Sequence, residues 1–419
     1  MSKLKLRCFD CELKYDLFEI RYFCPCGGLL EVSQDRAEVP ILTEKLDSRL
    51  TSRRAWDRSG VWRFREGLIP LPESSIVTQS EGSTPLHRSQ RLEQWCGSMN
   101  LWLKHEGENP TGSFKDRGMT LAVSVAKHLG QKVLACASTG NTSSSLASYA
   151  ARAGLKCVVF LPSGKVSQGK LSQTLAYGAH VFAVKGDFDR AMEIVRQLAE
   201  EKLVYLVNSI NPFRIEGQKT IIWELLQDLE WNPPDWILVP GGNLGNTSAF
   251  GKAIDEAFHW GWIKKRPKIA TIQAAGASPF FKSFQQNFAS LDAVKAETIA
   301  TAIRIGNPVN FPKARKAITS TDGLVECVTD SEIMEAKRQI DLAGIGCEPA
   351  SATTLAGLKK LRQNNQIKPE ESVIMILTGH LLKDNEASMD IHKVSFKEVE
   401  PEISKIRNAL SEISQGKSS

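Results

Sequence analysis

The stretch "KVLACASTGNTSSSLASYAARAGLKCVVFLP", residues 132–162, reads as an apolar strand, a polar loop, a helix and a second apolar strand. Both strand segments are apolar throughout, which is typical of parallel strands covered by helices on both faces. Further along, "HVFAVKG", "LVYLVNS" and "DWILVPGG" are each followed by a longer helical segment. This alternation predicts an α/β fold with parallel sheets and crossover helices.

The loop after the first of these strands is unusually rich in hydrogen-bonding side chains. Residues 138–145 hold six hydroxyl side chains and Asn141. Ligands of open α/β sheets bind beyond the carboxyl ends of the strands, and a helix start with free N–H groups attracts anions. N-capping uses the same residue types, but one cap residue would be enough for a helix. We therefore expect an anion site here.

The loop after "DWILV" is rich in glycine. Its turn favours a phosphate bound by backbone N–H groups, although a tight strand-to-helix turn would use similar residues. It matches neither the P-loop nor the G-x-G-x-x-G pattern. The turn consists of Gly241, Gly242, Asn243, Leu244, Gly245 and Asn246.

Two more loops place polar residues after strands. "IMILTGHLLKD" carries Thr378, and "NSINPFRIEGQKT" carries Asn208, Ser209 and Arg214. Arg214 could pair with an anion through two hydrogen bonds, although a single arginine at a helix start is usually a surface charge. Thr378 could equally cap a helix.

One lysine lies where a glycine-rich loop becomes a largely apolar helix. "ENPTGSFKDRGMT", residues 108–120, contains Lys115 after an apolar Phe114. A poorly hydrated lysine has a depressed pKa and can form a Schiff base. The alternative is a surface charge, which the apolar neighbour disfavours. A lysine among phosphate-cradling loops points to a pyridoxal phosphate site, in which the cofactor is the electron sink.

Four motifs together carry a family resemblance. "NPTGSFKDRGMT", "STGNTSSSLASYAARAG", "PGGNLGN" and "LTGHLLKD" resemble the threonine synthase family, pyridoxal-phosphate enzymes that share fold type II with the tryptophan synthase β-subunit. The resemblance covers roughly residues 76–390. It implies two open, mostly parallel sheets with helices on both faces, in a large domain of residues 76–125 and 216–390 and a small domain of residues 126–215. Residues 1–75 would form a cysteine-rich ribbon and linker, and residues 391–419 a helix and tail.

The resemblance also implies residue roles. Lys115 would hold the cofactor and later shuttle protons. Asn141 would bind the cofactor's phenolic oxygen, Thr378 would face its pyridine nitrogen, and the turn from Gly241 to Asn246 would cradle its phosphate. The residues implied to contact the substrate's carboxylate and phosphate are Ser138, Thr139, Thr142, Asn208, Ser209 and Arg214.

The implied reaction converts O-phospho-L-homoserine and water to L-threonine and phosphate by γ-elimination and β-addition. One alternative is another lyase of this fold, such as a serine or threonine dehydratase or a phosphoserine-using cysteate synthase. A second is a non-catalytic protein whose N-terminal segment binds a partner or nucleic acid. The intact Lys115 and its surrounding loops disfavour this second alternative.

Four cysteines crowd the N-terminus. Cys8, Cys11, Cys24 and Cys26 form two close pairs separated by a hairpin-length segment, which resembles a zinc ribbon with four thiolate ligands. The second pair is C-x-C rather than the usual C-x-x-C, so packed thiols without metal remain an alternative. Such a closed ligand set would make any zinc structural rather than catalytic.

Composition excludes some other classes. The 419-residue chain has a formal net charge of +6 and no dense basic stretch with interleaved aromatics, so we expect no nucleic-acid partner. Its apolar runs are too short to cross a bilayer, and no signal peptide is evident. A cytoplasmic enzyme is the default expectation, and a homodimer is common for this fold class.

Overall fold

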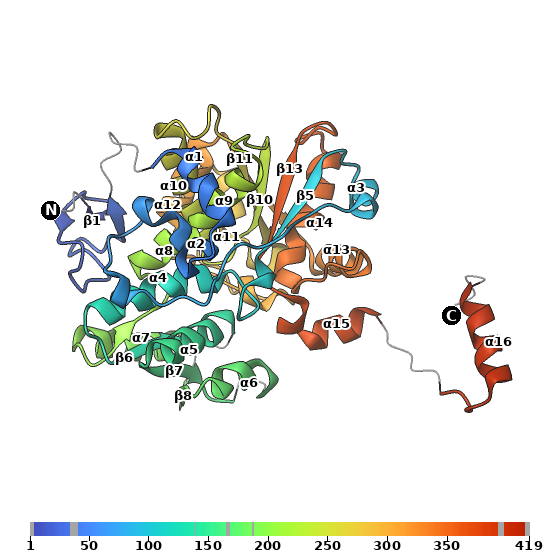
Figure 1. The fold of residues 1–419 in the computed structure, drawn as a ribbon, viewed down its shortest axis with the longest axis horizontal. Helices are drawn as coiled ribbons and strands as arrows, with labels where there is room; N and C mark the ends of the chain where they lie inside the picture. The colour runs from blue at the N-terminus through green and yellow to red at the C-terminus, as the bar shows by residue number, and fades with distance from the viewer. Residues whose placement is uncertain are drawn as a thin grey trace. The chain divides into compact units, whose positions relative to one another are not determined.

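The computed structural model describes residues 4–33, 41–138, 140–164, 168–186, 188–392 and 398–414. The chain forms two compact units, residues 1–384 and residues 385–419. The second unit contains helices α15 (Asn385–His392) and α16 (Ile403–Ser414). The first unit contains the sheets and the other helices (Figure 1).

The larger sheet has six strands in the order β12-β11-β10-β13-β5-β4. All neighbours are parallel except β4 and β5, which pair antiparallel. The order is not that of the sequence, because helices connect the parallel strands. The strands are β4 (Leu86–His87), β5 (Leu101–His105), β10 (Trp236–Pro240), β11 (Lys268–Ala274), β12 (Leu324–Val328) and β13 (Val373–Leu377).

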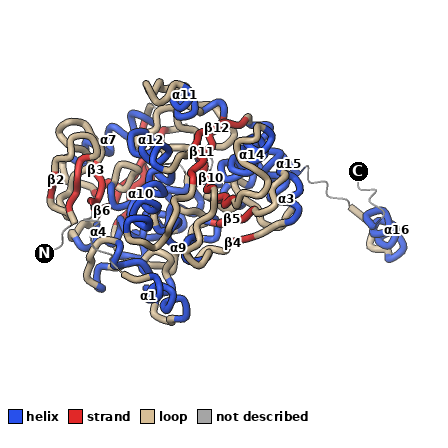
Figure 2. Tube along the Cα trace, turned by 90° about the horizontal axis from the view of Figure 1, so that it is seen from above, coloured by secondary structure: helices blue, strands red, loops and turns tan. Residues whose placement is uncertain are grey.

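The smaller sheet has four parallel strands in the order β8-β7-β6-β9. It contains the stretch from residue 132 to residue 162 as a β6–α5–β7 unit, so the predicted strand–helix–strand arrangement is confirmed. Figure 2 shows the strands of the first unit between helices. The strands are β6 (Val133–Ala137), β7 (Lys156–Pro162), β8 (His180–Val184) and β9 (Tyr205–Leu206).

The helices of the first unit lie along both sheets and in the N-terminal region. They are α1 (Thr43–Ser48), α2 (Ala55–Arg58), α3 (Gln90–Cys96), α4 (Lys115–His128), α5 (Asn141–Ala153), α6 (Gln168–Ala176), α7 (Phe188–Glu200), α8 (Pro212–Gln218), α9 (Thr220–Asp228), α10 (Gly245–His259), α11 (Pro279–Gln285), α12 (Phe311–Ser320), α13 (Asp330–Leu342) and α14 (Pro349–Gln363).

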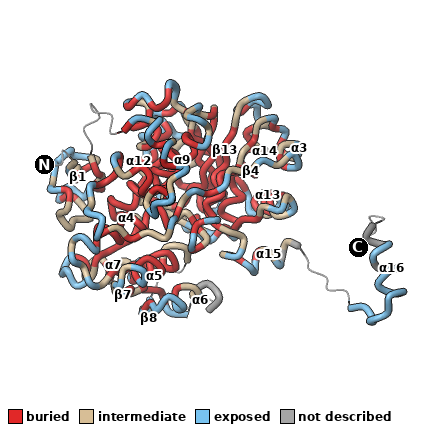
Figure 3. Tube along the Cα trace, in the orientation of Figure 1, coloured by how far each residue is buried: buried red, intermediate tan, exposed pale blue. Residues whose placement is uncertain are grey.

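The core lies on both faces of each sheet. In β10, Ile237 and Val239 pack into a cluster with α9 and α10, while Trp236 and Leu238 pack into a second cluster with α13 and α14. Successive residues of a strand point to opposite faces, so an all-apolar strand fills two layers. Figure 3 shows this buried centre. The two open, mostly parallel sheets with helices on both faces are as predicted.

The N-terminal segment forms a separate antiparallel sheet in the order β2-β1-β3. Its outer strand β3 is held by lysines from α10 and α12: Lys313 Nζ donates to Leu30 O at 2.6 Å and Lys252 Nζ to Val32 O at 2.5 Å. These ammonium groups satisfy carbonyls that an edge strand would otherwise leave unpaired. The strands are β1 (Lys5–Cys8), β2 (Lys14–Tyr15) and β3 (Leu30–Ser33).

Among the described residues, no helix is both long enough and apolar enough to cross a membrane.

Candidate active site

Lys115 is the first residue of α4, directly after a short contact between two distant motifs. Phe114 N donates to Thr378 O at 3.0 Å, and His380 N donates to Gly112 O at 2.9 Å. Ser113 and Gly379 form the bridge between them. The "GSFKDRG" and "LTGHLLKD" motifs are thereby held side by side, with Lys115 and Thr378 at one edge of the larger sheet.

A buried carboxylate that the sequence did not single out joins the other motifs. Glu348 Oε2 accepts from Asn141 Nδ2 at 3.0 Å, and Thr378 Oγ1 donates to Glu348 Oε1 at 3.4 Å. Thr378 Oγ1 also lies 3.0 Å from Ser351 Oγ. Glu348 thus connects the loop after β6 to the loop after β13. Its sequence signal, an acidic residue before a helix-starting proline, is too common to be noticed alone.

Glycine at position 379 makes this carboxylate position possible. A Cβ atom at Gly379 would lie 2.4 Å from Glu348 Cδ, which is closer than atoms can pack. The glycine of the "TGH" motif is therefore required by the close approach of Glu348.

The amine of Lys115 is prepared for nucleophilic and proton-transfer chemistry. Burial, together with the nearby Arg214 guanidinium, lowers the pKa of Lys115 to about 7, while Glu348 opposes the shift. The amine lies 4.1 Å from the centroid of the Phe114 ring. A lysine with a pKa near neutrality can give and take protons at physiological pH, which ordinary lysine cannot.

Arg214 reaches the site through a tight helix crossing. Helix α8 packs on α4 with glycines at the contact: a Cβ at Gly217 would lie 1.9 Å from Arg117 O, and one at Gly118 would lie 3.4 Å from Arg214 Nε. Only small residues allow backbones to approach this closely. Arg214 is buried, and burial lowers its pKa to about 10.

Two buried polar atoms near Lys115 lack partners among the described residues. They are Arg214 Nε and Ser113 Oγ. Buried polar groups in proteins are nearly always hydrogen-bonded, so these two atoms are available to a bound group. Sequence reasoning had missed Ser113, although it lies inside the quoted "GSFKDRG" motif.

The glycine-rich turn ends at the start of α10. Leu244 precedes the helix in a left-handed conformation (φ 60°) and provides no side-chain cap. The N-terminus of a fifteen-residue helix is therefore left for another acceptor. A Cβ at Gly245 would point toward amide groups at about 4 Å, of Gln218 and Asn310, with no closer atom. This cradle fits a phosphate group.

The predicted substrate residues differ in their surroundings. Ser209 Oγ accepts from Asn243 Nδ2 at 3.1 Å, which joins its loop to the glycine-rich turn. Asn208 uses its amide group on the backbone of Ala137, donating and accepting at 3.0 Å. Ser138 and Thr142 flank the start of α5 and are partly buried. Thr139 lies outside the described residues. Substrate contacts by these residues stay predictions.

These residues fit pyridoxal phosphate. They provide an amine of lowered pKa, an uncapped helix start with a glycine cradle, a hydroxyl at Thr378 and an amide at Asn141. The orphaned nitrogen of Arg214 offers a further anion contact.

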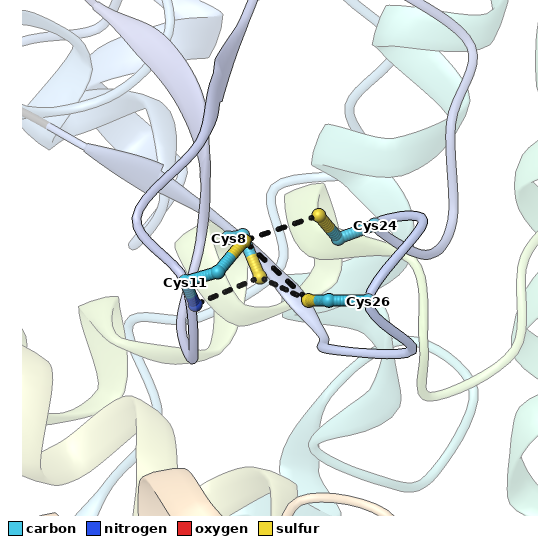
Figure 4. Close-up of side chains that lie close together, drawn as sticks. All are labelled: Cys8, Cys11, Cys24 and Cys26. Atoms are coloured by element: carbon cyan, nitrogen blue, oxygen red, sulfur yellow. Dashed lines mark hydrogen bonds between the residues drawn. The ribbon is translucent and has the colours of Figure 1, made fainter.

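The four N-terminal thiols converge at the end of β1, where Cys8 meets three cysteines from the connections between the strands. Their Sγ atoms all lie within 4.8 Å of one another, with Cys8 and Cys26 at 3.5 Å and Cys11 and Cys24 at 3.4 Å (Figure 4). Tetrahedral thiolates at about 2.3 Å from zinc are spaced similarly. Gly28 lies against this cluster, since a Cβ there would be 2.6 Å from Cys8 Sγ.

Comparison with known proteins identifies the family of this chain. Residues 77–379 match the family described as "Pyridoxal-phosphate dependent enzyme". The chain is 49% identical to the threonine synthase of Methanocaldococcus jannaschii over 97% of this chain and 99% of that protein. It is 46% identical to the threonine synthase of Methanosarcina acetivorans, over 92% and 94% of the two chains.

A solved structure agrees in fold. The crystal structure of threonine synthase from Escherichia coli superposes with a TM-score of 0.73 at 18% identity, covering 96% of this chain and 94% of that one. With this identity the likeness shows the fold alone. The family match and the identity to the archaeal relatives decide the rest: the chain belongs to the pyridoxal-phosphate dependent enzymes and, among them, to the threonine synthase family.

Proposed function

We propose that this protein converts O-phospho-L-homoserine and water to L-threonine and phosphate. The observation that carries the proposal is the pair formed by Lys115, whose pKa is about 7, and the buried, partly unsatisfied Arg214 beside it. The first provides a base and the second an anion contact. Pyridoxal phosphate, when bound, supplies the electron sink for a carbanion next to the substrate nitrogen.

The chain's own residues divide the work. Lys115 would accept a proton from the substrate Cα and then assist the removal of a second proton, from Cβ. Arg214, with Ser209 and the hydroxyls of the loop after β6, would hold the substrate phosphate as it leaves Cγ. A proton is then delivered to Cγ, which becomes the methyl group, the hydroxyl of water adds at Cβ, and Cα regains a proton, so that L-threonine and phosphate are the products. Glu348 would orient Asn141 and Thr378, which would help to hold the cofactor.

An assay of phosphate release tests this function directly. The cofactor-loaded enzyme should release one phosphate per threonine formed from O-phosphohomoserine. Under the same conditions L-serine, L-threonine and O-phosphoserine should react much more slowly. Faster ammonia release from serine or threonine would identify a dehydratase instead, and sulfonate formation from phosphoserine and sulfite a cysteate synthase.

Arg214→Gln should raise KM for O-phosphohomoserine about 10- to 100-fold, because a hydrogen bond to a charged group contributes roughly 1.5–3 kcal/mol. Inhibition by inorganic phosphate should weaken in parallel. Arg152→Gln, on the exposed face of α5, serves as the control and should change neither value. An unchanged KM in Arg214→Gln would remove Arg214 from the phosphate site.

We also infer that the four N-terminal cysteines bind one structural zinc ion. The convergence of their Sγ atoms supports this proposal. Cys8→Ser should reduce bound zinc from about one ion per chain to nearly none and lower the thermal midpoint, because structural zinc contributes folding free energy. Metal analysis and thermal unfolding measure both. Cys327→Ser, outside the cluster, should retain zinc; zinc-free wild-type protein would contradict the inference.

A homodimer remains our expectation from the fold class, and a cytoplasmic location our expectation from the short apolar runs of the sequence. Light scattering coupled to size exclusion would test the first part, and cell fractionation the second.

A further inference from the structure

Lys383 is a partly buried lysine close to the active site that the reaction described above does not use. It ends the 3-10 turn η7 (Leu381–Lys383), which follows the "LTGH" part of its motif. Its Nζ donates to Thr111 O at 3.0 Å, Ser144 Oγ at 3.0 Å and Gln173 Oε1 at 2.7 Å. An ammonium group has three N–H donors, so all of them are used.

The three acceptors come from three separate segments. Thr111 lies in the loop that leads into Lys115, Ser144 lies in the first turn of α5, and Gln173 lies in α6. Helix α5 packs on the smaller sheet, and α6 packs on α5. Lys383 itself follows β13 of the larger sheet. One amine therefore connects the loop that leads into Lys115 with α5 and α6 on the smaller sheet.

A cation is a costly choice at this position. All three acceptors are neutral groups, and burial lowers the pKa of Lys383, while the charges of Glu348 and Asp116 oppose that shift. An apolar side chain would avoid the desolvation cost. A charged donor, however, makes hydrogen bonds roughly twice as strong as a neutral one and fixes their direction. The three hydrogen bonds of Lys383 therefore fix the positions of these segments more specifically than apolar packing would.

The Lys115 loop, to which Lys383 is bonded through Thr111 O, is also held in place by Asp116. Asp116 accepts from Thr111 N at 2.7 Å, Thr111 Oγ1 at 2.6 Å and Ser145 Oγ at 2.5 Å. Asp116 thus fastens the Lys115 loop to α5 without reaching α6. Helix α6 also contacts α5 through Thr174 Oγ1 and Ser143 Oγ at 3.3 Å. Of these bonds, the one from Lys383 to Gln173 joins α6 directly to the larger sheet's side of the site.

We propose that Lys383 is a positioning residue that holds α6 and the first turn of α5 against the Lys115 loop, and so sets how firmly the active site closes around its substrate. The identity of that substrate rests on the proposed function. The three hydrogen bonds of Lys383 form without substrate, so their effect on α6 can be measured without it.

A double-mutant cycle with Lys383→Met, Gln173→Leu and the double variant tests the proposal on the full-length, cofactor-loaded enzyme. Without substrate, backbone amides of α6 should exchange about tenfold faster in Lys383→Met. With O-phosphohomoserine, KM should rise about tenfold while kcat changes less than about threefold. Gln173→Leu should have a smaller effect, and the double variant should be no worse than Lys383→Met alone, because the two residues share one bond.

Lys337→Met serves as the matched control, since it removes another buried lysine, one that pairs with Asp341 within α13. It should leave α6 exchange unchanged. Wild-type α6 exchange in Lys383→Met would overturn the proposal, as would independent effects of the two substitutions or a loss in kcat with KM unchanged. If Lys383→Met fails to fold, Gln173→Leu alone must still speed exchange. A wild-type enzyme that releases no phosphate would refute the proposed function, while the exchange result would still test whether Lys383 positions α6.

Discussion

Lys115→Ala is expected to reduce phosphate release from O-phosphohomoserine by at least about a thousandfold, because it removes a positioned acid–base group. The variant should also fail to retain pyridoxal phosphate through dialysis, since its covalent attachment point is gone. Activity and the cofactor's visible absorption measure the two effects. Lys127→Ala, an exposed lysine at the end of the same helix, is the control and should behave as wild type.

The pH dependence of cofactor uptake gives an independent check on Lys115. Its pKa is lowered to about 7, so the amine is mostly neutral above that pH and mostly charged below it. Only the neutral amine attacks an aldehyde. The rate at which cofactor-free enzyme takes up pyridoxal phosphate should therefore rise through about pH 7 and then level off. A rate still rising tenfold per pH unit at pH 9 would indicate an ordinary lysine with a pKa of about 10.4.

Arg117→Met should give the largest loss of stability, about 3–5 kcal/mol in the free energy of unfolding. Arg117 is fully buried between two carboxylates: its Nη2 lies 2.6 Å from Glu106 Oε1 and 2.8 Å from Glu224 Oε1. Removing the guanidinium leaves the Glu106 carboxylate buried without its arginine. Glu224 keeps Lys104 at 2.8 Å and Arg63 at 3.2 Å but loses its central partner.

Urea unfolding followed by fluorescence measures this change. The matched control is Lys268→Met, which breaks the exposed ion pair with Asp322. A surface pair contributes at most about 1 kcal/mol, so its midpoint should move little. Equal midpoints for the two variants would show that the buried network does not support the fold. Because Arg117 lies two residues after Lys115 in the first turn of α4, the network also anchors the start of that helix.

Much of this architecture is predictable from short stretches of sequence. An all-apolar strand followed by a polar helix start specifies both its layer and the edge where ligands bind, so the loops at residues 138–145 and 241–246 were found without tertiary information. Lys115 was found because an amine after glycines and a phenylalanine is locally unusual. The four cysteines were grouped correctly because thiols at such spacing have few uses.

Residues 41–75, expected as a linker, contribute buried side chains to the core. The sequence there is polar and rich in arginine and tryptophan, yet Trp62 and Phe64 are buried in the same cluster as α9 and α10. Ion pairs remove the charges from solvent in this region, as for Arg63 with Glu224. A charged residue is expected to be exposed unless its ion-pair partner is known. Here the partner of Arg63 lies far along the chain.

The sequence by itself determined the parallel α/β fold and the grouping of the four cysteines, and it predicted Lys115 as the catalytic lysine and residues 241–246 as the phosphate-binding turn. Each of these depends on the chemistry of neighbouring residues, which a single segment displays. Only the tertiary structure decided that Glu348 joins Asn141 to Thr378. The same holds for the close helix contact at Gly217 that brings Arg214 near Lys115. It also holds for the hydrogen bond from Lys383 to Gln173 in α6. These pairings arise where crossover connections bring remote strand ends to one edge, and no local pattern of residues specifies which side chains will meet there.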